Sequence, residues 1–423
     1  MIDIKLAREN PDLVKENLKK RLQDDKQIDL LLNLDTDWKN VKKQVDELRA
    51  KHNQVNRKIN EAKKKNMSIL ALLGEAKDIP KKIEEKEEQL KFFDKERIEL
   101  WKKIPNFIDK SVPVGDEKKN KVLKKYGEIT KKKIKDGHAE ILESLRLIDT
   151  KKAGEVSGSR FYYLKKELVR LNYALISFAL DFLEKKKLQL VQPPYMLKKE
   201  ILEGATTFDV FEEAIYKIEG ENLYLIGTAE HALNALKFNE VIDAKELPLR
   251  FAGVSSCFRK EAGAHGKDTK GIFRVHQFEK VEQFVFCKPE NSWKEFELLL
   301  NNSIELFKKL EIPFRTVVLA SGDTGKVSAK TIDLEGWFPS QGAYKELGSC
   351  SNCLDYQARR SNTRFQDGSE LKFVHTLNNT AVATERMMTC LVENNIQKNG
   401  SIKIPKVLVP YMNGLKKIEK GKN

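Results

Sequence analysis

Long apolar runs are missing from this sequence of 423 residues. None approaches the roughly 18 residues that a membrane-spanning helix requires, and residues 1–5 lack the apolar core of a secretion signal. Cysteine is scarce as well, and its 5 copies do not indicate a disulfide framework. We therefore expect no membrane partner and a protein that works in the reducing cytoplasm.

Positive charge, in contrast, is abundant. Lysine and arginine number 78 against 63 aspartates and glutamates, which gives a formal net charge of +15. This excess favours a polyanionic partner, but alone it does not separate RNA from DNA or an acidic membrane, and lysine is spread along the whole chain. The length suffices for two or three domains with a large core.

A regular helical repeat follows a short amphipathic helix that we expect over residues 3–20, entered at Pro11. Apolar residues then recur at alternating spacings of four and three, which is the seam of a coiled-coil helix. Asn66, Gly74 and Pro80 interrupt this pattern, and a second helical segment is predicted to end near Ile104. We expect an antiparallel two-helix hairpin that projects as an arm; a coiled-coil dimer is the alternative. The seam residues are Leu34, Trp38, Val41, Val45, Leu48, His52, Val55, Ile59 and Ala62.

Residues 251–286 form two strand-like runs joined by a loop rich in glycine and charge. Strand alternation would place guanidinium groups, carboxylates and an aromatic ring on one face of this hairpin. Such a set suits a nucleotide, although a solvated hairpin with scattered charges is the alternative. That face would carry Cys257, Arg259 and Glu261 from the first run and Arg274, His276, Phe278, Lys280 and Glu282 from the second, and the loop holds Gly263, Gly266 and Gly271.

Two weaker patterns complete the set of candidate binding sites that the residues alone indicate. Residues 223–230 resemble a strand running into a turn, with Thr228 and Glu230 on one face, where a carboxylate could hold an ammonium group. Cys350 and Cys353 have the spacing of half a zinc site, but no second pair completes it, so we expect no zinc.

The hairpin resembles motif 2 of class II aminoacyl-tRNA synthetases in the form found in seryl-tRNA synthetases. The matching residues are Arg259-x-Glu261-Ala-Gly, Asp268-Thr269-x-Gly271 and His276-Gln-Phe-Glu-Lys-x-Glu282, and the resemblance extends over roughly residues 1–412. It implies an α+β fold with a tRNA-binding N-terminal domain and helical arm (1–110), then a catalytic domain on an antiparallel sheet flanked by helices (111–423). Motifs 1, 2 and 3 would span about 164–195, 250–286 and 377–397, and residues 377–386 would open a helix.

The resemblance also implies roles for individual residues. Serine would be bound by Thr228, Ala229, Glu230, Arg259, Glu282, Asn378 and Thr380. ATP would be bound by Arg259, Lys260, Glu261, Arg274, Val275, Phe278, Glu346, Leu347, Gly348, Ser349 and Arg386. Arg259 and Arg386 would be the catalytic pair, and Glu346 and Ser349 would hold Mg²⁺. The usual motif 3 has glycines where this chain has Ala381 and Ala383.

The implied reaction is activation of L-serine with ATP to seryl-adenylate and pyrophosphate, followed by transfer to tRNA(Ser), by a cytoplasmic homodimer that does not bind DNA. Whether tRNA(Sec) is also charged stays open. Two other interpretations are a class II relative that loads a carrier protein, against which the arm argues, and a non-enzymatic RNA-binding protein on a retired catalytic fold. Against the latter stand the intact Arg259, Glu261, Phe278, Glu282, Glu346 and Arg386.

Overall fold

The computed structural model describes residues 1–129, 134–207, 214–261 and 270–419. Most of the loop of the 251–286 hairpin, with Gly263, Gly266 and the Asp268-Thr269 pair, lies outside the described residues. The chain divides into two compact units: residues 2–19 with 23–105, and Met1 with residues 20–22 and 106–423. No helix within the described ranges is long and apolar enough to cross a membrane.

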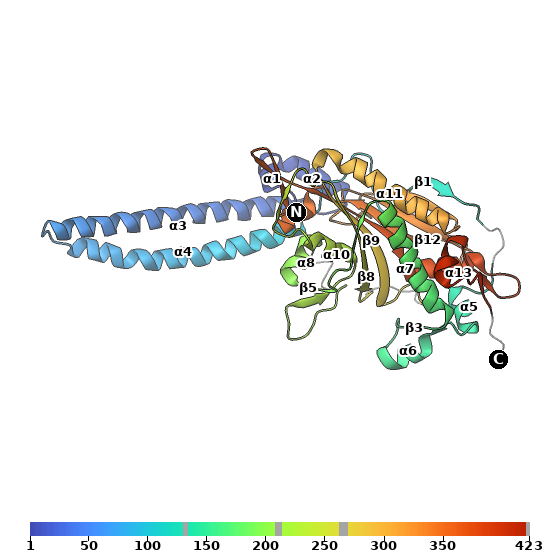
Figure 1. Ribbon diagram of the computed structural model, residues 1–423. Coiled ribbons are helices and arrows are strands. Elements are labelled where there is room, and N and C mark those ends of the chain that lie inside the picture. Colours follow the sequence, from blue (N-terminus) through green and yellow to red (C-terminus); the bar gives the residue numbers. More distant parts are fainter. Residues whose placement is uncertain (130–133, 208–213, 262–269, 420–423) are drawn as a thin grey trace. The chain divides into compact units, whose positions relative to one another are not determined.

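Two long helices, α3 (Lys26–Lys64) and α4 (Leu70–Lys103), make up most of the first unit and lie side by side (Figure 1). At 1.5 Å per residue, the 39 residues of α3 span about 58 Å. Every predicted seam residue is buried or half-buried, because the seam positions are those that face the partner helix. The predicted helical hairpin is therefore confirmed.

The helix boundaries differ from the prediction in two places. Residues 3–20 form two helices, α1 (Ile4–Glu9) and α2 (Pro11–Lys20), because proline disfavours the helical conformation of the residue before it. Of the three residues expected to interrupt the helical pattern, Asn66 does lie between the two arm helices. The expectation is wrong for Gly74 and Pro80, since both lie inside α4. Residues around them pack against the far end of α3, and this apolar contact outweighs the local preference.

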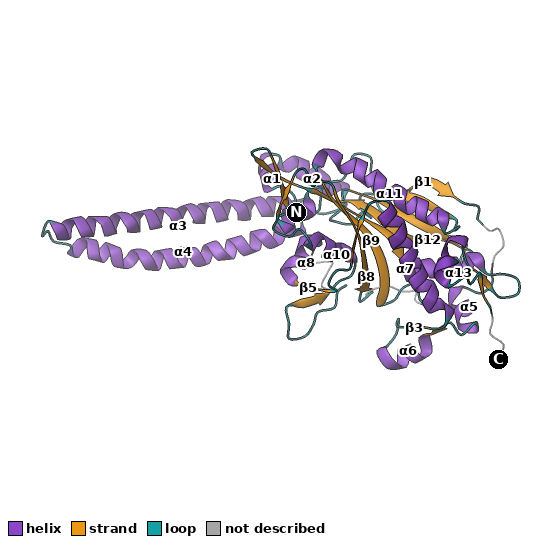
Figure 2. Ribbon diagram, in the orientation of Figure 1, coloured by secondary structure: helices purple, strands orange, loops and turns teal. Residues whose placement is uncertain are grey.

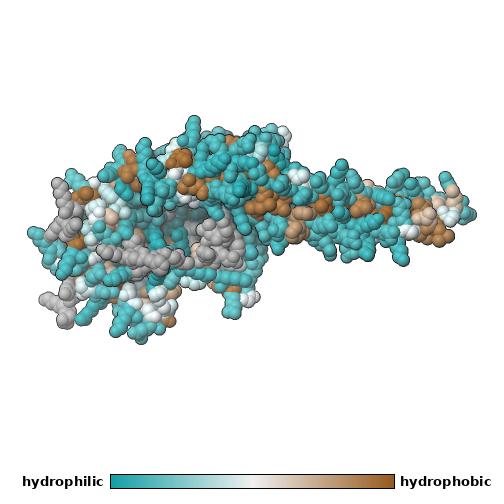
Figure 3. Space-filling model, turned by 180° about the vertical axis from the view of Figure 1, so that it is seen from behind, coloured by the Kyte–Doolittle hydropathy of each residue, from teal (hydrophilic) through white to brown (hydrophobic). Residues whose placement is uncertain are grey.

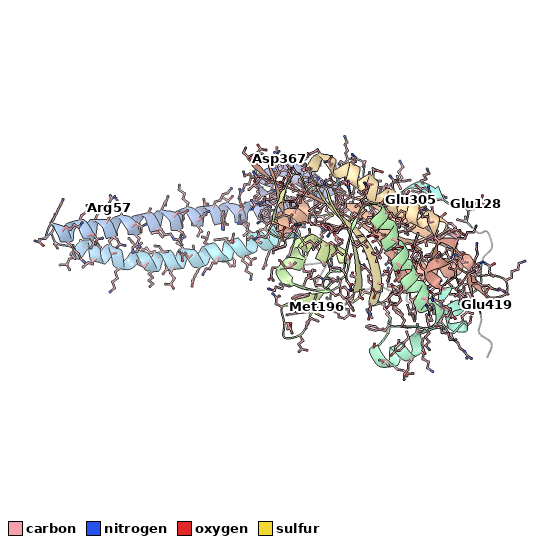
Figure 4. All side chains as sticks on the ribbon, in the orientation of Figure 1. Arg57, Glu128, Met196, Glu305, Asp367 and Glu419 are labelled. Carbon is pink, nitrogen blue, oxygen red and sulfur yellow. The ribbon has the colours of Figure 1, made fainter. Side chains whose placement is uncertain are left out.

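The surface of the arm is apolar only in restricted places. Figure 3 shows apolar side chains in a stripe along the helix pair and in a patch at its tip. At the tip, Met67, Leu70 and Leu73 are exposed. Charged side chains, Arg57 among them, project away from the helices (Figure 4). The remaining polar surface is consistent with a helix pair that buries only one face of each helix.

A buried charge cluster ties the base of the arm together. The carboxylate of Asp35 accepts hydrogen bonds from Arg8 at 2.7 Å and from Arg97 at 3.0 Å, and Lys39 lies 3.0 Å away. Burial alone would raise the pKa of Asp35, but these three cations together hold it well below its usual range. The Arg97 guanidinium also lies 4.0 Å above the ring of Trp38. The Asp35 carboxylate and the Trp38 ring thus stabilise the buried Arg97 guanidinium.

A large sheet forms the centre of the second unit (Figure 2). Within the described ranges it has eight strands in the order β1-β10-β11-β12-β15-β9-β8-β4, and every neighbouring pair is antiparallel except β4 with β8. This arrangement, with the helical arm, confirms the α+β class. The strands are β1 (Lys121–Tyr126), β4 (Gln189–Val191), β8 (Leu249–Phe258), β9 (Gln277–Cys287), β10 (Phe314–Val318), β11 (Lys330–Phe338), β12 (Ala343–Asn352) and β15 (His375–Ala383).

The two faces of this sheet have different coverings. Three helices pack over the main apolar core on one face: α7 (Glu167–Lys185), α11 (Ser292–Lys309) and α13 (Thr384–Asn395). The shorter helices α10 (Ala229–Ala235) and α12 (Tyr356–Ser361) contribute to a smaller cluster with Phe284 and Phe286 of β9. Because side chains alternate along a strand, Phe278, Lys280 and Glu282 lie on the same face as those two rings.

The hairpin and motif 3 are built differently from the prediction. The strand β9 begins at Gln277, not at Ile272, so Arg274 and His276 precede the ladder. The strand β8 ends at Phe258, and Glu261 has a left-handed backbone with φ of 47°, so strand alternation does not orient it. Residues 377–383, predicted to open a helix, belong to β15, and the helix begins at Thr384. Their backbone groups complete the ladder with β9 instead.

Candidate active site

A cavity with about 490 Å³ of empty space, part of it open solvent, lies where β8, β9, β12 and β15 meet the start of α13. Its wall combines cations, carboxylates and aromatic rings, contributed by segments more than 100 residues apart in the sequence. The residues that line it are Arg259, Glu261, Phe273, Arg274, Val275, Phe278, Lys280, Glu346, Leu347, Gly348, Thr380, Ala383, Glu385 and Arg386.

Arg259 is fixed from three sides just beyond the end of β8. Its backbone N–H donates to the carbonyl of His276 at 2.9 Å, and the His276 ring lies 2.9 Å from the carbonyl of Arg259. Its Nε donates to the carbonyl of Gly227 at 3.0 Å. The guanidinium lies 5.3 Å from the centre of the Phe278 ring, a cation–π distance. These contacts hold a cation and a stacking ring together at the cavity.

Arg386 supplies the second cation, at the first turn of α13. Its Nη1 lies 2.9 Å from a carboxylate oxygen of Glu346 and its guanidinium lies 5.3 Å from the centre of the Phe273 ring. The charge of Arg386 holds the pKa of Glu346 below its ordinary value. In the structure Arg386 packs on Phe273, and Phe278 packs on Arg259. The resemblance implies that a bound adenine would stack on Phe278 opposite Arg386, and this placement stays a prediction.

A polar cluster lies next to this cavity and shares Lys280 and Thr380 with it. Lys280 Nζ lies 2.5 Å from Glu282 and donates to Thr228 Oγ1 at 3.0 Å, while Thr380 Oγ1 donates to Glu282 at 3.3 Å. Burial raises the pKa of Glu282, and Lys280 opposes that rise. We call this set the polar cluster: Thr228, Glu230, Lys280, Glu282, Asn378 and Thr380.

Glu230 is the second carboxyl group of the polar cluster. Its Oε1 accepts from Gln357 Nε2 at 2.7 Å and from Asn378 Nδ2 at 3.0 Å. Burial, followed by the charge of Glu282, raises the pKa of Glu230 to about 7. The predicted strand geometry is wrong here: the preceding strand β6 ends at Leu225, Thr228 is the N-cap of α10 and Glu230 lies in the first helical turn.

The predicted site residues divide into three groups. Nine of the candidates line the cavity: Arg259, Glu261, Arg274, Val275, Phe278, Glu346, Leu347, Gly348 and Arg386, and Thr380 lines it together with the polar cluster. Thr228, Glu230, Glu282 and Asn378 lie in the cluster behind it. Lys260, Ser349 and Ala229 do not line the cavity, and the side chain of Ala229 packs in the apolar cluster of α10.

The side chain of Ser349 nevertheless lies on the face of β12 that borders the cavity. The ladder between β11 and β12 shifts register beside Leu334 and Glu335, and such an irregularity resets strand alternation. Leu347 and Cys350, three residues apart, therefore both point into the core under the helices. This leaves Glu346 and Ser349, also three apart, on the opposite face.

Five site residues were absent from the roles that the resemblance implied: Phe273, Lys280, Ala383, Glu385 and Gln357. Lys280 could have been chosen, because it alternates with Phe278 and Glu282 along one strand. Gln357 reaches Glu230 from 127 residues away, and no spacing in the sequence signals that contact.

The fold of the second unit is that of the class II aminoacyl-tRNA synthetases. Residues 213–395 match the family model of the tRNA synthetase class II core domain (G, H, P, S and T). A prolyl-tRNA synthetase from Giardia lamblia shares the fold, with a TM-score of 0.56 and 14% sequence identity over 64% of this chain and 54% of that one.

Within that class the N-terminal unit and full-length relatives identify the family. Residues 1–108 match the model of the seryl-tRNA synthetase N-terminal domain. A serine–tRNA ligase from Nitrosopumilus maritimus is 47% identical over 99% of this chain and 100% of its own length. The crystal structure of seryl-tRNA synthetase from Pyrococcus horikoshii complexed with ATP matches with a TM-score of 0.91 and 45% identity over the whole of both chains. The chain belongs to the seryl-tRNA synthetase family, and the resemblance seen in its sequence is confirmed.

Proposed function

We propose that this protein activates L-serine with ATP and then transfers the seryl group to the 3′ end of tRNA(Ser). The observation that supports this most directly is the strand β9, which contributes both to the cation-rich cavity and to the polar cluster next to it. A nucleotide in the cavity and a small polar amino acid in the cluster would meet at Lys280 and Thr380. ATP is the nucleotide present in the similar Pyrococcus horikoshii structure.

In the first step the serine carboxylate attacks the α-phosphorus of ATP and pyrophosphate leaves. The nucleophile is already an anion, so no general base is needed, and the rate depends on alignment and on stabilisation of phosphoryl charge. Arg259 would bridge the carboxylate and the α-phosphate, and Arg386 would hold the outer phosphates. Phe278 would stack on adenine and Glu261 would accept from its amino group.

Magnesium fits the donors that face the cavity. Glu346 offers a carboxylate and Ser349 a hydroxyl on the same face of β12, and Mg²⁺ prefers oxygen ligands shared with substrate phosphates. The low pKa of Glu346, caused by Arg386, keeps this ligand ionised. When bound, the ion would neutralise charge on the β- and γ-phosphates.

The polar cluster supports selection of serine by charge and hydrogen bonding. Glu282 is paired with Lys280, whereas no lysine or arginine of the described residues forms an ion pair with Glu230, so Glu230 is the better partner for the substrate ammonium. Glu282 and Thr380 would pair with the serine hydroxyl. Alanine would leave these buried groups without partners, and a site of this kind rejects such an analogue strongly.

The remaining proposals concern the assembly. The basic arm would hold the tRNA, the helix α7 with strand β4 would form a homodimer interface, and the enzyme would work in the cytoplasm. Lys260, which does not line the cavity, would also contact ATP. The lysines that flank the arm tip, which the sequence also allows as a solvated face, are the candidates for RNA contact: Lys63, Lys64, Lys65, Lys77, Lys81 and Lys82.

Amino-acid-dependent ATP–pyrophosphate exchange, run with each of the twenty amino acids and without tRNA, tests the activation step. We expect exchange with serine alone. Exchange with another amino acid in place of serine would overturn the assignment. Aminoacylation of tRNA(Ser) and tRNA(Sec) by the full chain then tests the acceptors, and a variant lacking residues 30–100 should retain exchange while losing charging.

A further inference from the structure

A carboxyl group to which the steps above give no role lies in the cavity wall. Glu385 precedes Arg386 in α13, and only 1% of its surface is exposed. Its oxygens accept three hydrogen bonds: from the Tyr162 hydroxyl at 2.5 Å, from the backbone N–H of Glu279 at 3.0 Å and from Thr384 Oγ1 at 3.0 Å. None of the lysines and arginines in the described ranges forms an ion pair with it.

The bond to Glu279 extends the sheet beyond the last residue of a strand. The ladder between β15 and β9 ends at the pair Ala383 and Lys280. The next N–H along β9 belongs to Glu279, and the Glu385 carboxylate accepts from it where a backbone carbonyl would otherwise be required. Glu279 stands between Phe278 and Lys280, so this bond fixes the segment that carries both side chains relative to the helix that carries Arg386.

Tyr162 belongs to a short segment that contacts the same cavity from a third direction. Arg160 Nη1 donates to the carbonyl of Glu261 at 2.6 Å, and its own carbonyl accepts from the N–H of His276 at 3.2 Å. The ring of Phe161 lies 5.2 Å from that of His276. Residues 160–162 thus connect both flanks of the hairpin to α13, although they lie about 100 residues before the hairpin in sequence.

This carboxyl group is costly to bury. Burial raises the pKa of Glu385 to about 7, and the group has only neutral hydrogen-bond donors to offset its desolvation. An apolar side chain would fill the same space without that cost but would leave the Glu279 N–H and the Tyr162 hydroxyl unpaired. Its three donors come from β9, from α13 and from the 160–162 segment, so one side chain sets the spacing of three structural elements.

We propose that Glu385 and Tyr162 are positioning residues for ATP, which fix the distance between the Phe278 ring and the Arg386 guanidinium. This inference rests on the proposed ATP site. An adenine base that stacks between the Phe278 ring and the Arg386 guanidinium depends on this distance, in ATP and in AMP alike. Serine, which would bind in the polar cluster, does not depend on it.

The test compares nucleotide with serine in Tyr162→Phe and in Glu385→Gln. Dissociation constants for ATP and AMP are measured by calorimetry on the full chain, and KM for ATP and for serine by pyrophosphate exchange. We expect about a tenfold weaker affinity for both nucleotides, which corresponds to about 1.4 kcal/mol, with the KM for serine within about twofold of wild type. The double variant should lose little more than either single variant, because both remove the same connection.

Tyr163→Phe is the matched control, since Tyr163 is the next residue and its side chain is exposed; it should leave every constant unchanged. A KM for serine that rises as much as the KM for ATP, or ATP constants within twofold of wild type in both variants, would overturn the inference. Failure of the wild-type protein to bind ATP or to support serine-dependent exchange would instead overturn the proposed function, so the two failures are distinguishable. If Glu385→Gln does not fold, Tyr162→Phe alone gives the same comparison.

Discussion

The cavity and the polar cluster share strands but present their charged groups in opposite ways. In the cavity, cations are aimed at open space and are held by rings, a carbonyl and a carboxylate: Arg259 by Phe278 and Gly227, Arg386 by Phe273 and Glu346. In the polar cluster, carboxyl groups are enclosed and held by amides, hydroxyls and one lysine. Cations on an open wall suit a polyanion that binds together with a counter-ion. Enclosed carboxyl groups suit a small ammonium compound, each of whose polar atoms needs a hydrogen-bond partner in the site.

The contrast also shows why Lys280 matters. It lines the cavity, yet it is paired with Glu282 and donates to Thr228. Because its charge is neutralised by Glu282, it links the two regions without adding an unpaired cation to the phosphate side. The two halves of the site can therefore be changed separately, and the following predictions make use of that.

The largest effect is expected from Arg386→Ala, which breaks only the cavity. Removing one preorganised charge at a developing anion lowers catalysis by about 10²–10³-fold, so kcat/KM for ATP in pyrophosphate exchange should fall by that order while serine binding by the free protein is unchanged. Arg57→Ala, on the exposed surface of α3, is the control. An Arg386→Ala enzyme with normal exchange would contradict the role given to this guanidinium.

A smaller, pH-dependent effect is expected in the polar cluster. Burial raises the pKa of Glu230 to about 7, so below that pH the carboxyl is neutral and attracts an ammonium weakly. The KM for serine should rise about tenfold for each unit that the pH falls below 7, while the KM for ATP changes little. In Glu230→Gln the serine profile should be flat between pH 5.5 and 8.

The same pKa has a consequence for stability with a defined sign. The pKa of Glu230 is higher in the folded than in the unfolded protein, so its favourable contribution is complete below about pH 4.5 and is lost as the pH rises through about 7. Glu230→Gln should therefore raise the Tm relative to wild type at pH 8 and not at pH 4.5. An equal change at both values would show that burial does not control this group.

The smallest effect on exchange is expected from the charge cluster of the arm, which belongs to neither half of the site. Asp35→Asn leaves Arg8 and Arg97 without their carboxylate and should destabilise the arm by about 3–5 kcal/mol, seen as an earlier transition in thermal unfolding. Charging of tRNA should weaken and pyrophosphate exchange should not change. The exposed Asp37→Asn should alter neither measurement.

The parts of the structure that follow from short-range pattern could be predicted. The seam from Leu34 to Ala62 needs only helical periodicity, and the common face of Phe278, Lys280 and Glu282 needs only strand alternation. The predictions that were wrong concern features that depend on tertiary contacts. Pro80 lies inside a helix because its neighbours pack on α3, and Arg274 precedes the ladder that was expected to orient it. Gln357 is a hydrogen-bond partner of Glu230, and Tyr162 is one of Glu385. Both partners are distant in the sequence, and only the fold brings them near.

The measurement that tests the account most directly compares Glu282→Gln with wild type for serine and alanine. Pyrophosphate exchange gives kcat/KM for each amino acid, and calorimetry gives ATP affinity in the same preparations. We predict unchanged ATP affinity and a loss of preference for serine over alanine of about 10²-fold or more, because the hydroxyl loses its charged acceptor. A variant that keeps its preference for serine, or that loses ATP binding to the same extent, would contradict the separation of the site into a cavity for the nucleotide and a polar cluster for the amino acid.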